Sequence, residues 1–356
     1  MTVATGSPEH VAHVDDLARR LVAAGVPRVR EESIPMRRWT PRRCELRPFG
    51  PAVPVAYTAR TGPEGVTGPL SSRARAGVVG LARIPATERN VLDWDGAPVP
   101  DPSLAQEEIR DALARFETAG AVGAVLVVDE PDTFLLRDGR HRGIPAVFVG
   151  PDHGLREGEE VTVVLEADID VVTTRNLVAL VPGATPDLVA LQSATDGPDA
   201  LADNDSVLAA VAELVRADLT AGVLVLLTTG RLATEEVWGV PAFLAEHRDD
   251  VVPRLTAAVS VAGPCFATGH RALLDCARRA LVRAGAEPGV LRPFVPDDRS
   301  PDGWTWPGDG GPFWCAGVPT LQLPRVDTLG RAVRELSATP REEVSRRVVL
   351  ETPLHR

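Results

Sequence analysis

Acidic side chains stand beside several apolar stretches of this sequence, and their types could support chemistry. Asp196 ends an apolar run in L-V-A-L-Q-S-A-T-D-G, and Asp203 lies a little further along the chain. Asp309 stands in a glycine-rich segment, and the adjacent Glu235 and Glu236 come soon after a second apolar run. Carboxylates can ligate zinc, or act as a general base on a metal-bound water. Carboxylates gathered in one pocket also raise one another's pKa values, so such a site needs a nearby cation.

One arginine is placed to supply that cation. Arg231 directly follows Gly230 at the end of the run V-L-V-L-L-T-T-G-R. Arginine stays charged, and its planar fork can bridge carboxylates bidentately. We therefore expect Arg231 to reach Asp203 or Asp309. The alternative is that Arg231 is one of many surface arginines, since the sequence contains no lysine and its 38 basic residues are all arginine.

Aromatic and histidine side chains give further candidates for binding. Trp304, Trp306 and Trp314 lie close together in a chain with only 4% aromatic residues, and they form either a core patch or a hydrophobic wall over a ligand. His270 is the one histidine of seven that we expect near a cleft, unless it is an exposed or capping residue. We expect Cys315 to be a packed thiol, because no basic partner is evident for it.

Composition excludes several kinds of partner. The net charge of −11 argues against nucleic acid. No apolar run reaches the roughly 18 residues that a membrane span needs. The polar first residues do not read as a secretory signal, and the four cysteines are widely separated, so we expect reduced thiols and a cytoplasmic protein. A small molecule or a peptide remains the expected ligand, and the oligomeric state is left open.

The elements that must position these residues alternate along the second half of the chain. Residues 8–25 have helical apolar spacing, with His10 and His13 on that helix, and a first strand is expected at 28–35. Alternation of strands and helices predicts an α/β fold with a mostly parallel, doubly wound sheet. In such sheets, sites form beyond the carboxyl ends of the strands. The predicted strands are 177–181, 187–191, 222–228, 257–261 and 318–323; the predicted helices are 208–219, 242–247, 270–285, 328–336 and 340–348.

A block in the first half of the chain has a different texture. It is rich in proline and glycine, with short strands at 76–81, 124–128, 145–149 and 160–165 and a helix at 103–119. We predict that residues 50–172 form a small α/β domain inserted into a discontinuous main domain, made of residues 1–49 and 173–356.

Six segments, in this order, resemble the zinc-dependent aminopeptidases and the related glutaminyl cyclases, with an inserted protease-associated domain. The resemblance implies a zinc-exopeptidase-like fold. The segments are A-G-A-V-G-A-V-L-V-V (119–128) with G-I-P-A-V-F-V (143–149), T-R-N-L-V-A-L-V-P-G (174–183), L-V-A-L-Q-S-A-T-D-G (188–197), A-D-N-D-S-V-L-A-A-V-A-E-L (202–214), V-L-V-L-L-T-T-G-R (223–231) with W-G-V-P-A-F-L (238–244), and P-G-D-G-G-P-F-W-C-A-G-V-P (307–319).

The resemblance also implies where metal ligands should stand, and most are missing. The family binds two zinc ions through two His, two Asp and a Glu. The first histidine falls on Ala194, an acidic ligand on Ser260, and the last histidine on Gly310. These side chains cannot donate to zinc, or do so poorly. The bridging aspartate is kept as Asp203.

The family's remaining ligand and its catalytic base are a pair of glutamates. The family's glutamate pair falls near 232–233, and Glu235 and Glu236 could replace it only if the loop is shifted by about three residues. Asp196 and Asp309 match supporting rather than primary positions.

We therefore predict a degenerate aminopeptidase homologue that uses neither metal nor cofactor. Two functions remain open. One is a metal-independent enzyme of a biosynthetic pathway, such as a cyclase or isomerase. The other is a protein that binds a ligand or partner in the old cleft, which is the cleft where the family holds its zinc ions. A third alternative, a hydrolase with a rearranged mono-zinc site, would need Asp203, Glu235 or Glu236, and a new nitrogen ligand.

Overall fold

The structure is a computed structural model. It describes residues 3–55, 58–84, 90–92, 98–100, 102–129, 143–197, 199–230, 239–262, 265–268, 270–285 and 309–346. Within those ranges the four cysteines are free thiols, and no helix is both long and apolar enough to cross a membrane.

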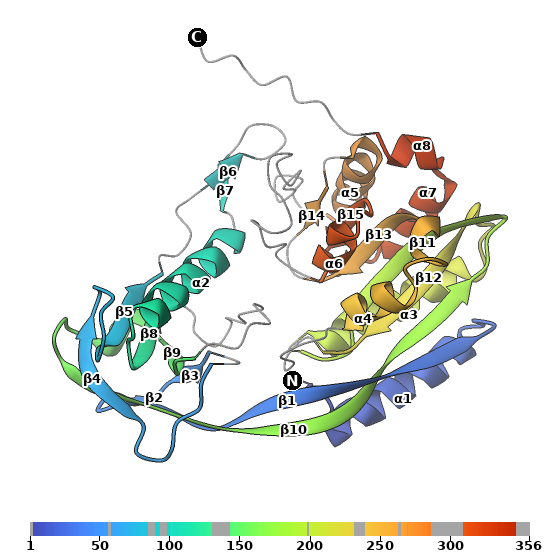
Figure 1. Ribbon diagram of the computed structural model, residues 1–356. Coiled ribbons are helices and arrows are strands. Elements are labelled where there is room, and N and C mark those ends of the chain that lie inside the picture. The colour runs from blue at the N-terminus through green and yellow to red at the C-terminus, as the bar shows by residue number, and fades with distance from the viewer. Residues whose placement is uncertain are drawn as a thin grey trace, which may run out of the picture.

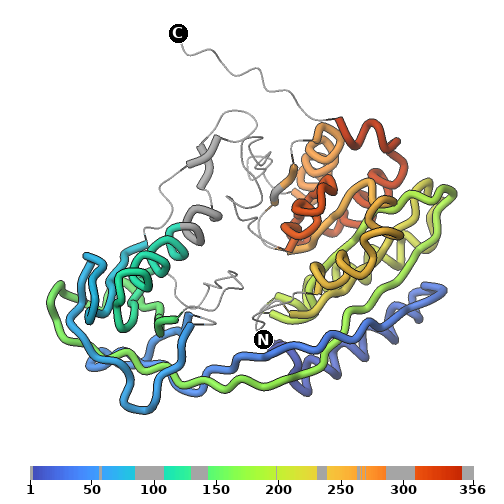
Figure 2. Tube along the Cα trace, in the orientation of Figure 1, coloured from blue at the N-terminus to red at the C-terminus, as the bar shows by residue number. Residues whose placement is uncertain are grey.

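A long two-stranded ribbon runs from one lobe of the molecule to the other, along the lower part of the view in Figures 1 and 2. Strands β1 (Val29–Arg47) and β10 (Glu160–Val181) pair antiparallel from Val29–Ala179 to Arg47–Thr162. The sequence predicted strands at 160–165 and 177–181 and a first strand at 28–35. These segments do lie in strands, but the first strand continues to Arg47, and 160–165 and 177–181 belong to the single strand β10. Ala167, Ile169 and Val171 alternate with polar residues in the middle of β10, but none of residues 166–173 is fully buried. Backbone pairing with β1 holds it extended nevertheless.

Four parallel strands form the centre of the larger lobe, in the order β15-β13-β11-β12. Strand β10 pairs antiparallel with β12, and the short β14 (Phe266–Ala267) pairs antiparallel with β15. The predicted α/β class with a mostly parallel sheet is confirmed. The parallel strands are β11 (Thr185–Ala194), β12 (Ala221–Thr228), β13 (Leu255–Val261) and β15 (Thr320–Leu323).

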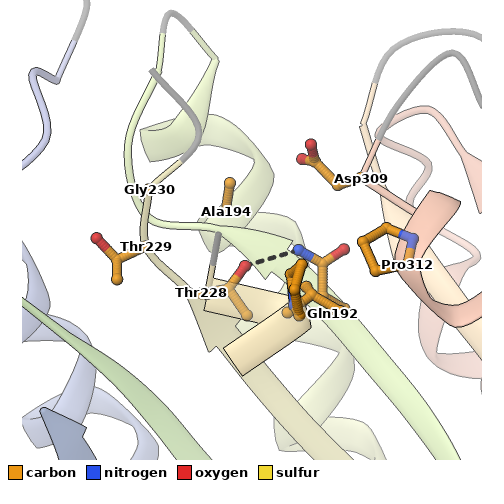
Figure 3. A pocket seen from close by; sticks show the side chains of 10 residues that line it. Gln192, Ala194, Thr228, Thr229, Gly230, Asp309 and Pro312 are labelled. Atoms are coloured by element: carbon orange, nitrogen blue, oxygen red, sulfur yellow. Dashed lines mark hydrogen bonds between the residues drawn. The ribbon is translucent and has the colours of Figure 1, made fainter. Parts of the chain in front are cut away.

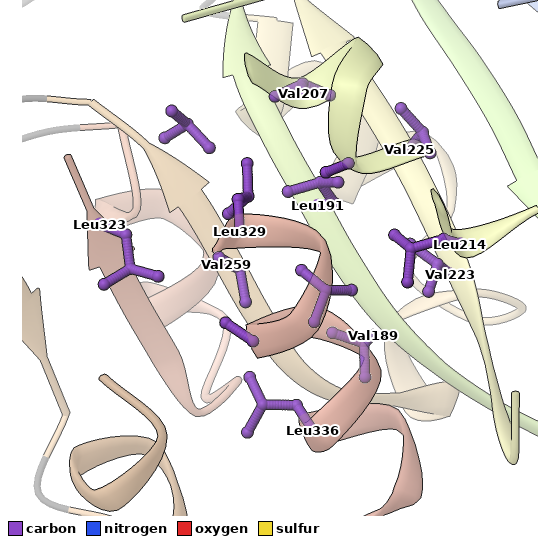
Figure 4. Close-up of a cluster of buried hydrophobic side chains, with 14 of the residues drawn as sticks. Val189, Leu191, Val207, Leu214, Val223, Val225, Val259, Leu323, Leu329 and Leu336 are labelled. Carbon is purple, nitrogen blue, oxygen red and sulfur yellow. The ribbon is translucent and has the colours of Figure 1, made fainter. Parts of the chain in front are cut away.

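Helices cover both faces of this sheet, because side chains alternate along each buried strand. Val189 and Leu191 of β11 pack with α1, α3, α5 and α7 in the main core (Figure 4). Leu188 and Ala190 pack on the other face with α4 and α6. The helices are α1 (Pro8–Ala23), α3 (Ala200–Leu214), α4 (Gly239–Glu246), α5 (Arg271–Arg283), α6 (Gly311–Cys315), α7 (Leu329–Ala338) and α8 (Arg341–Val344), with a 3-10 turn η3 (Val252–Arg254).

Helix α3 begins earlier than its apolar pattern indicates. The sequence predicted 208–219, whereas the helix spans Ala200–Leu214. Its first turns contain the polar Asp203 and Asn204, which are buried. Asn204 donates to the Ala194 carbonyl, so a buried polar contact, together with the buried Ala200, holds the start of the helix.

The smaller lobe has apolar clusters of its own. Gly80 lies against the Phe116 ring, where an added Cβ would stand 2.4 Å from Cγ. Strands β1 and β10 run across the boundaries predicted near 49 and 172, so the division into two domains stays a prediction. The elements are β2 (Gly50–Pro51), β3 (Val53–Pro54), β4 (Val66–Ser71), β5 (Val79–Arg83), β6 (Asn90–Leu92), β7 (Pro98–Pro100), α2 (Pro102–Thr118), β8 (Gly123–Val127), β9 (Ala146–Val149) and η2 (Pro151–His153).

Candidate functional site at the carboxyl ends of the parallel strands

A row of buried polar side chains joins three neighbouring strands near their carboxyl ends. The Gln192 amide donates from Nε2 to Thr228 Oγ1 at 2.9 Å, as Figure 3 shows. Ser260 Oγ donates to Gln192 Oε1 at 2.5 Å. All three side chains are buried. The position to which the resemblance assigns an acidic ligand, Ser260, is therefore part of a neutral hydrogen-bonded row.

A small pocket lies at this edge of the sheet. Figure 3 shows the Asp309 carboxylate and Thr229 on opposite sides of it, with Ala194 and Thr228 between them. Gly230 and Gly239, which flank residues 231–238 in the sequence, both line the pocket. Arg231, Glu235 and Glu236 lie outside the described residues. The full lining is Gln192, Ala194, Thr228, Thr229, Gly230, Gly239, Val240, Pro241, Asp309 and Pro312.

Asp203 is paired with an arginine that the sequence did not single out. Arg325 Nε lies 3.5 Å from Asp203 Oδ1, and its Nη2 lies 3.6 Å from Asp199 Oδ1. The Asp203 side chain is only 5% exposed, whereas that of Arg325 is 47% exposed. Arg325 follows the end of β15. The arginine that the sequence favoured, Arg231, instead comes after β12 in the chain.

Asp196 contacts the N-terminal segment. Thr5 Oγ1 donates to Asp196 Oδ2, and both side chains are buried. Val3 and Gly197 pair through two backbone hydrogen bonds, of 3.2 Å and 2.9 Å. The residues before α1 therefore pack directly on the loop that follows β11.

His10 lies under the same loop, and its contacts define its tautomer. Thr195 Oγ1 donates to the Thr228 carbonyl at 3.0 Å, so it accepts from His10 Nε2 at 2.8 Å. The Gly6 N–H donates to His10 Nδ1 at 3.0 Å. These contacts fit a neutral ring with its proton on Nε2. Burial, followed by repulsion from His13 and Arg175, lowers the pKa of His10 from 6.5 to about 4.

His13 is tied to the same edge through Asn204. The Asn204 amide nitrogen donates to Ser193 Oγ at 2.9 Å and to the Ala194 carbonyl at 2.8 Å. Its Oδ1 lies 2.9 Å from His13 Nε2. The Asn204 side chain thus links α1, α3 and the end of β11.

His10 and His13 were predicted only to lie on the first helix, although the sequence carries a signal for a buried His10. His10 lies on the same helical stripe as Val14, Leu17 and Leu21, and these four residues are the buried ones of α1. A histidine on an apolar stripe must find polar partners inside the protein.

The other predicted binding residues are dispersed. His270 is buried at the start of α5, where its Nδ1 lies 2.7 Å from Thr268 Oγ1, and it does not line the pocket. Trp314 is half-buried on α6, and Cys315 is exposed rather than packed. Trp304 and Trp306 lie outside the described residues. Of the predicted site residues within the described ranges, Asp309 alone lines the pocket.

The described residues do not fit a two-zinc site. Ala194 and Gly310 carry no donor, and the Ser260 hydroxyl is engaged with Gln192. The Asp203 carboxylate already has a guanidinium beside it. In the described ranges, no three His, Cys, Asp or Glu side chains gather as a metal site would require.

Comparison with solved structures identifies the fold. The chain is similar to a zinc aminopeptidase from Bacillus subtilis, with 16% identity, a TM-score of 0.60, and 90% of this chain and 80% of that chain covered. It is also similar to a peptidase M28 precursor from Shewanella amazonensis, with 17% identity, a TM-score of 0.63, and coverage of 96% and 84%. An aminopeptidase from an Aneurinibacillus species gives 15% identity, a TM-score of 0.58, and coverage of 97% and 87%.

No family model matches the sequence, and no curated protein matches it. The chain therefore has the fold of the zinc aminopeptidases, as the sequence predicted. At these identities the likeness establishes the fold alone.

Proposed function

We propose that this chain is a degenerate relative of the zinc aminopeptidases that binds a small-molecule or peptide ligand in the old cleft and has no metallopeptidase activity. The observation that carries the proposal is the ion pair between Arg325 and Asp203. The resemblance assigns Asp203 the place between two zinc ions. A guanidinium 3.5 Å from that carboxylate would repel a dication at the same place.

The polar groups at the strand ends support binding rather than hydrolysis. Gln192, Thr228 and Ser260 already satisfy one another, and Thr195 is engaged with His10. Groups held in this way can shape a pocket, but they supply neither a Lewis acid nor an activated water.

Asp309 favours a second candidate, a metal-independent enzyme. Its side chain is the one carboxylate among the described residues that line the pocket. A carboxylate at a pocket wall can move a proton in an isomerisation or cyclisation. A mono-zinc hydrolase would instead need Glu235 or Glu236 together with Asp203, after Asp203 leaves Arg325.

Metal content and activity test the proposal together. The purified chain is dialysed against a weak chelator, and its zinc is measured by elemental analysis. Activity toward chromogenic amino-acid substrates is assayed with and without added zinc. We expect no stoichiometric zinc and only background activity. About one zinc per chain, with activity that a chelator removes and zinc restores, would establish the hydrolase instead.

Ligand binding is tested through stability. A ligand that binds only the folded chain raises Tm as its concentration rises. We expect an amino acid, a dipeptide or a cyclised derivative to raise Tm, and Asp309→Asn to remove that rise. If Asp309→Asn leaves the shift intact, the ligand does not bind in this pocket.

The remaining assignments rest on sequence features. We propose that residues 50–172 are an inserted unit resembling a protease-associated domain, with the clusters around Phe116 and Leu70 as its own core. We also propose a cytoplasmic protein without nucleic-acid or membrane partners, in keeping with the net charge of −11.

A further inference from the structure

A second cavity, of about 410 Å³, lies at the opposite edge of the sheet, near the amino ends of β11 and β12. Its floor is apolar, with Val178, Leu180, Leu188 and Leu224 from three strands, and Phe243 of α4 forms a wall. Helix α4 ends at Glu246, so it covers the centre of this face but not the end of β10. Leu180 is consequently 41% exposed. Cavities of this size and character bind small molecules in many proteins.

Arginines surround this apolar floor. Arg28, Arg30 and Arg254 line the cavity, and Asp250 is the carboxylate among its lining residues. Asp250 lies 3.4 Å from His247 Nδ1, and Arg30 is paired with Glu32 at 2.5 Å.

Two of these arginines have guanidinium groups that form no ion pair with a described residue and could bind an anion. They are Arg28 and Arg254, and Arg254 uses its Nε to donate to the Pro186 carbonyl at 2.7 Å.

We infer that this cavity binds a small amphiphile with an anionic head group and an unbranched apolar tail. Arg28 and Arg254 hold the head group, and the tail lies over Leu180, which is the exposed side chain of the apolar floor. Guanidinium groups match carboxylate and phosphate oxygens bidentately, so either head group fits the same chemistry. The site is separate from the pocket at the carboxyl ends of the strands, and the inference does not depend on the proposed function.

A neighbouring cavity limits the length of the tail. It shares Arg30, Phe243 and His247 with the first cavity and continues along β1. Its other lining residues include Glu32, Ser33 and Glu246, which are poor partners for a methylene chain. Affinity should therefore rise by up to roughly fourfold for each buried methylene and then level off when the tail reaches this polar wall.

Calorimetric titration of the whole chain with probes of matched length tests the inference. The probes are decanoate, decyl phosphate, decanol and acetate, with butyrate, hexanoate and octanoate to vary the tail. We expect decanoate or decyl phosphate to bind at least tenfold more tightly than decanol, and acetate not to bind. The stronger of the two anions identifies the head group.

Matched variants locate the site. Arg28→Glu and Leu180→Asp should each weaken binding at least tenfold. Arg216→Glu makes the same charge change at another exposed arginine, and Val171→Asp adds a carboxylate to the same strand β10, at a residue that is 79% exposed. Both controls should bind as the unmodified chain does, and so should Asp309→Asn. Thermal unfolding of each variant confirms that it is folded.

Four results would overturn the inference. The first is equal binding of decanol and decanoate, which would remove the role of the arginines. The second is equal loss of binding in the cavity variants and their controls. The third is no measurable binding of any long-chain probe by the folded chain. Loss of binding in Asp309→Asn alone would move the ligand to the other pocket and would likewise refute a site here.

Discussion

Arg325 Nε lies 3.5 Å from Asp203 Oδ1, and the two residues come from the end of β15 and the first turns of α3. The carboxylate is almost fully buried and carries a counter-charge from the protein itself. A cation compensates this aspartate, as the sequence analysis expected, but the cation is Arg325. Whether Arg231 also contributes stays a prediction, since it lies outside the described residues.

Removing that guanidinium should destabilise the protein. Arg325→Ala leaves the Asp203 carboxylate buried without this partner, and we expect a loss of about 1 kcal/mol, since Arg325 is half exposed and water screens the pair. The double variant Arg325→Ala with Asp203→Asn should recover part of the loss. Urea unfolding measures both, with Arg216→Ala as control. Additive losses in the double variant would show that the pair is not coupled.

Acid should destabilise the protein through His10. Its folded pKa is about 4, below its ordinary value of 6.5. As the pH falls below 6.5, the unfolded chain takes up a proton that the folded chain refuses, so stability is lost between pH 6.5 and pH 4 and is fully present above that window. The shift corresponds to ~3 kcal/mol in total.

Comparison with His10→Gln isolates this contribution, because glutamine does not titrate. Urea unfolding of both proteins at several values between pH 7.5 and pH 4 gives the two slopes. We expect the unmodified chain to lose more stability than the variant over this range. Parallel curves would mean that His10 is not held neutral.

The hydroxyl of Thr5 should contribute measurably to stability. Thr5→Val keeps the shape of the side chain but removes the donor to the buried Asp196. We expect a loss of about 2 kcal/mol, since hydrogen bonds to charged groups are among the stronger ones. Thr67→Val is the matched control, because Thr67 bonds Thr162 on an exposed surface. Similar losses from both variants would count against a special role for Thr5.

Gly80→Ala should test whether the smaller lobe is a separate unit. The new Cβ would overlap the buried Phe116 ring, and we expect a loss of about 3 kcal/mol. If the lobe unfolds on its own, hydrogen exchange will accelerate in β5 and β8 while β11 and β13 keep their protection. Equal acceleration in both lobes would argue for a single cooperative unit.

Most of the fold could be predicted from the sequence, because its central strands are continuous apolar runs. Much of the site could not, because it is built from polar contacts between distant residues. Continuous apolar runs located β11, β12 and β13, because both faces of these strands are buried. The middle of β10 alternates Ala167, Ile169 and Val171 with polar residues instead of forming a continuous apolar run, and it pairs with β1.

The contacts of the site could be anticipated only in part. The stripe of α1 places His10 inside the protein, yet nothing local indicates that Thr195 is its partner. Arg325 is one of 38 arginines, and its selection by Asp203 depends on where β15 ends relative to α3.

The long pairing of β1 with β10 has a consequence for the order of folding. Its inner end joins Arg47 to Thr162 and its outer end joins Val29 to Ala179, so the chain between them is a large loop whose closure costs entropy. The smaller lobe occupies that loop. Once folded, it brings Arg47 and Thr162 together and acts as the turn of a very large hairpin. The pairing of β1 with β10 can then extend from Arg47 and Thr162 to Val29 and Ala179. We expect pulse-labelled amides of β5 and β8 to become protected before those of Val29 and Ala179, and Gly80→Ala to delay both.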